Sequence, residues 1–117
     1  MPLIKIHYSF EVQQKQLHQL TAVLTEILAE VLGKSEEFIM TIFQKTELQS
    51  FGSKINLPSL YAEVKNVGSI SAETSTQLAR DLTNALIVSF DVSASRVYIE
   101  FQESERHHWA WNGKTFQ

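Results

Sequence analysis

Pro2 has the most distinctive chemistry in this chain, because removal of Met1 would make it the amino-terminal residue. The small residue at position 2 is compatible with that removal. A free α-amino group has a reference pKa of about 8, and burial in an apolar pocket or a nearby cation lowers that pKa. The neutral amine could then take a proton from a carbon next to a carbonyl group, with the proline ring fixing its lone pair. The simpler interpretation is that Pro2 only begins a strand.

Two adjacent histidines, His107 and His108, raise the question of a metal site. Adjacent residues of a strand point to opposite faces, so on a strand this pair would be a poor chelator. No third ligand stands out, and Glu103, Glu105 and Arg106 are most simply a solvated turn. We therefore expect neither a metal nor a cofactor.

The composition narrows the class of protein. A chain of 117 residues with 44% hydrophobic and 20% charged residues is typical of one soluble globular domain. A net charge of -3 argues against nucleic acid as a partner, which usually requires a basic face. No apolar run approaches the roughly 20 residues of a membrane span, and a signal peptide is not evident, so we expect a cytoplasmic protein without a membrane partner. With no cysteine, disulfides and thiol nucleophiles are excluded.

The two halves of the chain resemble each other at one constant offset of 58 positions (82 − 24 = 58). The offset aligns a helical leucine stripe and positions in the segments around it, in order. The aligned pairs are Leu20 with Leu78, Leu24 with Leu82, Leu28 with Leu86, Ser35 with Ser93, Ile39 with Val97, Phe43 with Phe101, and Ile6 with Val64. We infer a duplicated strand–helix–strand unit within one domain, with repeats of about 1–58 and 59–117.

Hydrophobic periodicity predicts the same elements in each half. Steps of three and four between apolar residues indicate helices, and β-branched or aromatic runs indicate strands. Gly33 is expected to end the first helix and Ser71 to cap the second. The predicted strands are Leu3–Tyr8, Phe38–Phe43, Ala62–Val67 and Arg96–Phe101, and the helices follow the stripes Leu17–Leu32 and Leu78–Leu86.

These elements predict an α+β fold, with a four-stranded sheet and two helices on one face. Residues 50–58 are expected to form a loop, and Asn112-Gly113 to turn a small hairpin of short C-terminal strands. Because the predicted strands are rich in isoleucine and valine, the helix-free face is expected to be apolar and to require cover. Self-association, with the sheets of several subunits facing inward, is the simplest way to cover this face.

Several short motifs, in this order, make the chain resemble the macrophage migration inhibitory factor family of the tautomerase superfamily. They are Met-Pro at the start, Gly33-Lys34, Phe51-Gly52-Ser53, Val67-Gly68, Arg96-Val97-Tyr98-Ile99, and Trp111-Asn112-Gly113-Lys114-Thr115-Phe116. The resemblance covers the length of the chain. It implies a homotrimer of βαβ repeats in which three sheets enclose a channel, with an active site at each subunit interface.

The resemblance also implies roles for individual residues. Pro2 matches the family's catalytic base, and Lys34 matches the lysine that binds the substrate's carboxylate or carbonyl oxygen. Without the resemblance, Lys34 would be a solvated residue at a helix end. The remaining matches are Val67 through its backbone, the lining residues Tyr98, Trp109, Trp111 and Phe116, and Phe38 at the rim. For such aromatic residues the simpler role is packing in the core or at an interface.

Three departures from the family pattern bear on function. Glu100 stands where well-known animal members carry asparagine, and a carboxylate there would disfavour an anionic substrate unless Arg96 or Lys34 pairs with it. Trp109 replaces a smaller aliphatic residue and should narrow the pocket. The Cys-x-x-Cys of the animal cytokine is missing from residues 58–62, which excludes thiol oxidoreductase activity of that kind.

The resemblance therefore predicts a cofactor-independent keto–enol tautomerase that acts on a small aromatic α-keto acid, such as a phenylpyruvate-like or dopachrome-like compound. A cytokine-like binding protein with a vestigial pocket is the main alternative, although no feature identifies a receptor. A third is another proline-dependent reaction of the superfamily, for which an additional arginine signature is not evident.

Overall fold

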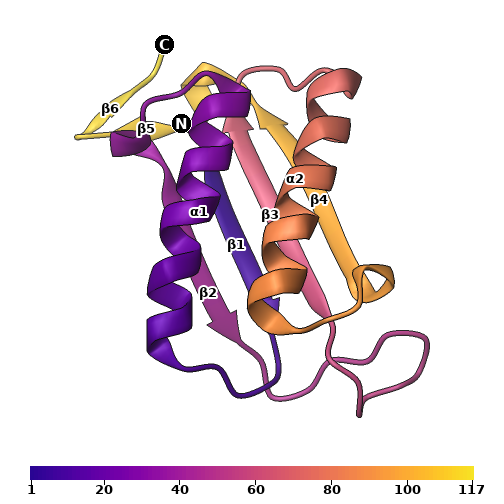
Figure 1. The fold of residues 1–117 in the computed structure, drawn as a ribbon. Coiled ribbons are helices and arrows are strands. Elements are labelled where there is room, and N and C mark those ends of the chain that lie inside the picture. Colours follow the sequence, from indigo (N-terminus) through magenta and orange to yellow (C-terminus); the bar gives the residue numbers. More distant parts are fainter.

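Residues 1–117 are described by a computed structural model, in which a four-stranded sheet carries both long helices on one face (Figure 1). The strands lie in the order β2-β1-β3-β4, with β1 parallel to β2, β3 parallel to β4, and β1 antiparallel to β3. This confirms the predicted fold class. The elements are β1 Leu3–Tyr8, α1 Gln14–Leu32, β2 Met40–Lys45, β3 Leu60–Val67, α2 Ala72–Phe90, β4 Val97–Ser104, the hairpin β5 Ala110–Trp111 and β6 Lys114–Thr115, and the 3-10 turns η1 Glu36–Phe38, η2 Ala94–Arg96 and η3 Arg106–His108.

The ends of both helices are set by local chemistry. Gly33 takes a left-handed conformation (φ 66°) and ends α1, as predicted. Ser71 caps α2, because its hydroxyl accepts a hydrogen bond from the Thr74 N–H at 3.1 Å. Asp91 ends α2 with φ 51°, the left-handed conformation that Gly33 adopts in the first unit. Neither helix is long and apolar enough to cross a membrane.

The internal repeat extends to details that its sequence offset alone did not specify. A shift of 58 positions carries α1 onto α2 and η1 onto η2, end to end. It also carries the left-handed Gly33 onto the left-handed Asp91. Ser35 and Ser93 correspond as well, and each hydroxyl accepts the N–H of the residue two positions later. The two units thus share the same helix length and the same turn back into a strand.

The core lies between the helices and one face of the sheet. The leucine stripes of α1 and α2 meet alternate residues of the strands, and many of these side chains are fully buried. The wholly buried leucines are Leu20, Leu24 and Leu28 of α1, with Leu78, Leu82 and Leu86 of α2. Their strand partners include Ile4 and Ile6 of β1 and Val64 of β3.

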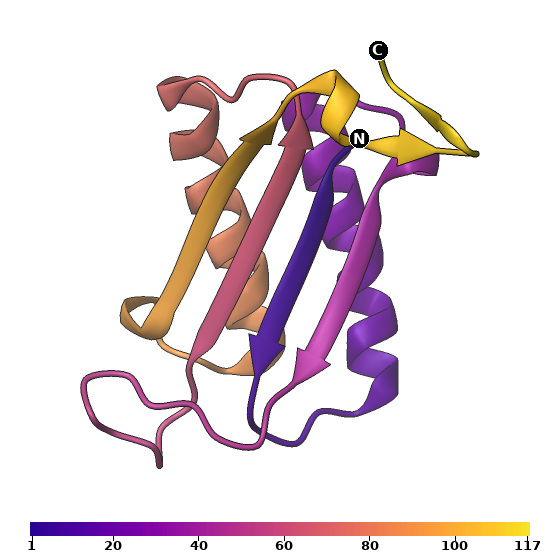
Figure 2. The ribbon, with the colours of Figure 1, turned by 180° about the vertical axis from the view of Figure 1, so that it is seen from behind.

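The face of the sheet that carries no helix is turned toward the viewer in Figure 2. This face is not the apolar surface that the strand composition predicted. Alternation along the strands turns Ile4, Ile6 and Val64 toward the helices, so the other side of β1 and β3 carries mainly polar and charged residues. Lys5 of β1 lies opposite Glu63 of β3. Glu63 in turn is aligned with Glu100, and Tyr61 with Tyr98 of β4. Most of the isoleucines and valines that suggested an apolar face pack against the helices instead, so that argument for self-association is wrong.

Two predicted strand starts also differ from the structure, each because a tight turn precedes the strand. Phe38 lies in η1, which starts where the Ser35 hydroxyl accepts the Glu37 N–H, so β2 begins only at Met40. Arg96 belongs to η2 and not to β4. His107 and His108, for which we considered a strand conformation, lie in η3.

Arg96 anchors the predicted loop 50–58. Its guanidinium donates hydrogen bonds to four backbone carbonyl groups and lies over the ring of Phe51, 5.3 Å from the centroid. The acceptors are the carbonyl oxygens of Pro58 (2.9 Å), Phe51 (3.0 Å), Lys54 (3.1 Å) and Leu57 (3.2 Å). One arginine side chain thus satisfies much of the backbone of this segment.

Replacement of Leu82 by alanine should strongly destabilise the fold. The Leu82 side chain is fully buried in the core, so truncation leaves a cavity and should lower the free energy of unfolding by about 2–5 kcal/mol. Val88→Ala on the same helix, where the side chain is 83% exposed, is the matched control and should change it by less than about 0.5 kcal/mol. Urea unfolding followed by circular dichroism measures both values, and equal effects would contradict this assignment of the core.

Candidate functional site

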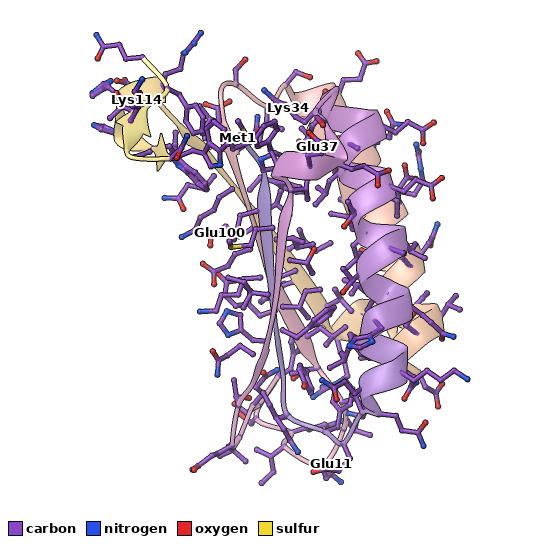
Figure 3. All side chains as sticks on the ribbon, turned by 90° about the vertical axis from the view of Figure 1, so that its left-hand side faces the viewer. Met1, Glu11, Lys34, Glu37, Glu100 and Lys114 are labelled. Carbon is purple, nitrogen blue, oxygen red and sulfur yellow. The ribbon has the colours of Figure 1, made fainter.

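The candidate site lies at the end of the sheet where the chain begins (Figure 1). Here β1 starts, α1 ends, and the hairpin of β5 and β6 passes close to the amino terminus. Side chains from these distant segments gather at one place, with Met1, Lys34 and Glu37 close together (Figure 3). Glu11 lies at the opposite end of the molecule.

Pro2 is held firmly at this end. The Met40 N–H donates a hydrogen bond to the Pro2 carbonyl oxygen at 3.2 Å, which ties the start of β1 to the start of β2. The Pro2 ring is fully buried in the presence of Met1. In this form the Pro2 nitrogen is an amide with no basic lone pair, and the α-amino group belongs to Met1. Met1 lines both of the cavities at this end, so its removal would open them to the Pro2 nitrogen.

The first cavity is apolar and has a volume of about 390 Å³. Its walls come from the start of the chain, from η1 with the start of β2, and from the C-terminal segment. Across the cavity wall, Phe38 and Trp111 meet edge to face, with ring centroids 5.2 Å apart. Pro2, Phe38, Trp109, Trp111 and Phe116, all expected at the site, line it together with Leu3, Ile39, Met40, Ala110 and the single carboxylate of Glu37.

The second cavity, of about 500 Å³, carries the positive charge of the site. It shares Met1, Phe38 and Phe116 with the first cavity and adds Lys34, Val67 and Gly68. Lys34 follows the glycine that ends α1, and Val67 is the last residue of β3, so the ends of two elements bring them together. The two cavities therefore collect seven of the predicted site residues within one chain.

Arg106 also lines the second cavity, although the sequence suggested only a solvated turn there. Its Nε donates a hydrogen bond to the Phe116 carbonyl oxygen at 2.7 Å, which orients the guanidinium and binds the C-terminal segment. With Lys34, it gives the site two cations. Only the folding of η3 against the tail places Arg106 here, so the sequence carried no signal for it beyond its charge.

The electrostatics of this end favour a neutral amine. Burial lowers the pKa of the Met1 α-amino group below its ordinary value, and the positive charge of Lys34 lowers it further. Both causes act by disfavouring the protonated form. An amine at Pro2, one residue further into the protein, would meet the same two influences.

Tyr98 and Glu100, which were also predicted at the site, line neither of these two cavities. Both project from the helix-free face of β4, where Tyr98 packs against Phe51 with ring centroids 4.9 Å apart. Figure 3 shows Glu100 on that face, away from Met1 and Lys34. If these residues take part in catalysis, they must do so in a site on a neighbouring subunit.

Glu100 has a hydrogen-bond partner other than the two expected ones. The Tyr61 hydroxyl donates to its carboxylate at 2.5 Å, and this bond is the main cause that raises the pKa of Tyr61 to about 12. Arg96 is occupied by loop carbonyls instead. On the same face, His7 meets the Glu63 carboxylate at 2.7 Å, which lowers the pKa of Glu63.

Comparison with known proteins places these features in a family. The sequence model of the family described as macrophage migration inhibitory factor (MIF) matches residues 1–117. Among characterised relatives, the macrophage migration inhibitory factor of Xenopus tropicalis is 29% identical over 93 residues, which are 80% of each chain.

Solved structures agree with the sequence comparison. The homologue of macrophage migration inhibitory factor from Prochlorococcus marinus superposes with a TM-score of 0.90 at 30% identity, covering 98% of this chain and 99% of that one. At 12% identity, a protein inactivated by 2-oxo-3-pentynoate has the same fold, with a TM-score of 0.87 over 96% of this chain and 93% of its own.

Replacement of Lys34 by methionine should raise the pKa of the amino-terminal amine. The variant removes a nearby positive charge, so the protonated amine becomes easier to form and titration moves to higher pH. The pH dependence of N-terminal acylation, read by mass spectrometry, measures the shift. Lys15→Met, an exposed position in the first turn of α1, is the control and should leave the titration unchanged. An unchanged titration in Lys34→Met would contradict the electrostatic coupling.

Proposed function

The chain belongs to the macrophage migration inhibitory factor family, and from this premise we propose that it is a cofactor-independent keto–enol tautomerase of phenylpyruvate-like aromatic α-keto acids. One observation carries the proposal. The amino-terminal end of the chain lies where an apolar, aromatic cavity meets a cavity that contains two cations. An aromatic α-keto acid has the matching parts, with a ring at one end and a carboxylate next to a carbonyl at the other.

The proposed reaction requires only proton transfer. After removal of Met1, the neutral amine of Pro2 accepts the proton of the enol hydroxyl, and the carbonyl double bond forms as the carbon–carbon double bond opens. The resulting ammonium then delivers a proton to the carbon next to the carbonyl. A base whose pKa lies near the working pH suits both steps, since it must accept and return the same proton. Burial and Lys34 lower the pKa of the Met1 α-amino group, and the same influences on a free Pro2 amine would favour such a pKa.

The two cations and the aromatic walls would position the substrate. Lys34 would bind the carboxylate, and Arg106 could share it because its guanidinium is already oriented by the Phe116 carbonyl oxygen. The aromatic residues Phe38, Trp109 and Trp111 would hold the ring and exclude water. Exclusion of water strengthens the charge interactions that hold the substrate in place.

We also propose that the protein is a homotrimer with its sites at subunit interfaces. The outer strands β2 and β4 have unpaired edges in a single chain, which favours association with another strand. Met40 on β2 is 56% exposed and Tyr98 on β4 is 66% exposed, so each edge carries a large apolar or aromatic side chain. Association of one subunit's β2 side with its neighbour's β4 side would bring Tyr98 toward the cavity that Met40 lines.

Pro2→Gly should lower the tautomerase rate on phenylpyruvate by about 100-fold or more, because it removes the positioned secondary amine that acts as general base. Enol and keto forms absorb differently in the ultraviolet, so the rate can be followed directly. Mass spectrometry must first establish that Met1 is absent, since retained Met1 leaves Pro2 as an amide. Val88→Ala, far from the cavities on α2, is the control and should keep the wild-type rate. Wild-type activity in Pro2→Gly would contradict proline catalysis.

A covalent probe separates a wrong base from a wrong substrate. The electron-poor alkyne of 2-oxo-3-pentynoate accepts a neutral amine by conjugate addition, so the processed protein should gain the mass of one probe molecule at Pro2. A protein that the probe labels but that turns over no aromatic keto acid would have the reactive amine without the proposed activity. That result would favour the cytokine-like alternative. Lack of labelling in a protein with a confirmed free Pro2 would argue against a neutral amine.

The shared site predicts complementation between inactive variants. Light scattering should give three times the chain mass of 13.4 kDa. Unfolded and refolded together, Pro2→Gly and Tyr98→Ala subunits should regain activity, because some mixed sites combine an intact Pro2 with an intact Tyr98. Pro2→Gly with Lys34→Ala is the control and should regain none, since both residues come from one chain. A stable monomer, or no recovery in the first mixture, would contradict the interface site.

A further inference from the structure

A group of metal-binding side chains lies on the turn between β4 and the C-terminal hairpin. Glu105, His107 and His108 are exposed, and one ligand atom from each lies within 4.8 Å of the others. On a strand, these two adjacent histidines would point to opposite faces. In η3, however, successive side chains are separated by about 120°, so neighbours can approach each other. The two imidazole rings have centroids 4.1 Å apart.

We propose that Glu105, His107 and His108, here called the Glu105–His108 turn, bind one divalent transition-metal ion of the Zn²⁺ class. Imidazole nitrogen and carboxylate oxygen are ligands that Zn²⁺ accepts, usually in a tetrahedral arrangement. With metal–ligand bonds of about 2.0–2.1 Å, tetrahedral ligand atoms are about 3.3–3.4 Å apart. The Glu105 Oε2 and His107 Nδ1 atoms are already 3.4 Å apart. Rotation of the exposed His108 side chain completes three protein ligands, and water takes the fourth position.

The backbone of the turn is already ordered for this role. The His108 N–H donates to the Glu105 carbonyl oxygen at 2.9 Å and closes η3. The turn is also tied to the tail, because the Phe116 N–H donates to the Arg106 carbonyl oxygen at 3.2 Å and Arg106 Nε returns a bond to Phe116. Metal binding therefore has to order only three side chains, which limits its entropic cost.

The surroundings favour a cation despite the neighbouring arginine. A polar groove of about 540 Å³, without hydrophobic lining residues, adjoins the turn and contains the carboxylates of Glu103 and Glu105. Arg106 also lines this groove, but its guanidinium is held by the Phe116 carbonyl oxygen. Because all three ligands are exposed, an ion can reach them without crossing the core.

The position of the turn links the ion to the candidate site without placing it there. Arg106 and Trp109, on either side of the two histidines, line the cavities, whereas the three ligands do not. A bound ion would hold this wall in place and take no part in proton transfer. The inference does not depend on the proposed tautomerase activity.

Isothermal titration of tag-free protein with Zn²⁺ tests the proposal. Wild type should bind one ion per chain, and His107→Ala and His108→Ala should each weaken binding by about tenfold or more, since even outer-shell partners contribute that much. Glu105→Gln should also weaken it. His18→Ala, which removes an exposed histidine of α1, is the matched control and should bind as wild type does.

Electron paramagnetic resonance with Cu²⁺ provides a second measurement, in which wild type should show two nitrogen ligands and each single histidine variant one. The ligands are exposed, so the variants should fold, and circular dichroism checks this. Absence of Zn²⁺ uptake by wild type, or equal uptake by the His107→Ala/His108→Ala double variant, would overturn the proposal.

Discussion

The parallel pairing of β1 with β2 is the constraint on which the candidate site depends. Two parallel strands cannot be joined by a tight turn, so α1 must carry the chain back to the end where β1 began. The residues that follow α1 therefore reach the amino terminus whatever their own contacts. Lys34 and Phe38 arrive there as a consequence of the crossover, and the hydrogen bond from Met40 to the Pro2 carbonyl oxygen closes the arrangement.

The same crossover operates in the second unit without producing a second site. A shift of 58 positions carries Pro2 onto Leu60 and Lys34 onto Val92, which are both buried and apolar. Since β1 and β3 are antiparallel, the second unit also begins at the opposite end of the sheet. There Arg96 binds the carbonyls of the 50–58 loop. The two units thus share the same scaffold, whereas the residues of the candidate site gather at one end of the sheet only.

Two cations lie at the amino-terminal end of the sheet. Lys34 and Arg106 line one cavity, where burial and the lysine charge both oppose protonation of the amine. Carboxylates of the helix-free face have partners of their own: Glu63 contacts His7, and Glu100 accepts from Tyr61. A carboxylate engaged in this way disfavours an anion less than a free one would.

The sequence by itself determined the scaffold, because helix stripes, caps and the repeat are local or periodic signals: Gly33, Ser71 and the leucines have the roles that their positions predicted. Motif order also predicted Pro2 and Lys34 as members of one site, and the structure places both beside cavities at the same end of the sheet. Tertiary structure decided which face each strand buries, and it replaced an expected apolar face with a mainly polar one. It alone placed Arg106 in the cavity that Lys34 lines and brought His107 and His108 together with Glu105. These outcomes depend on how a turn packs against the distant tail, and no local pattern of residues encodes such a contact.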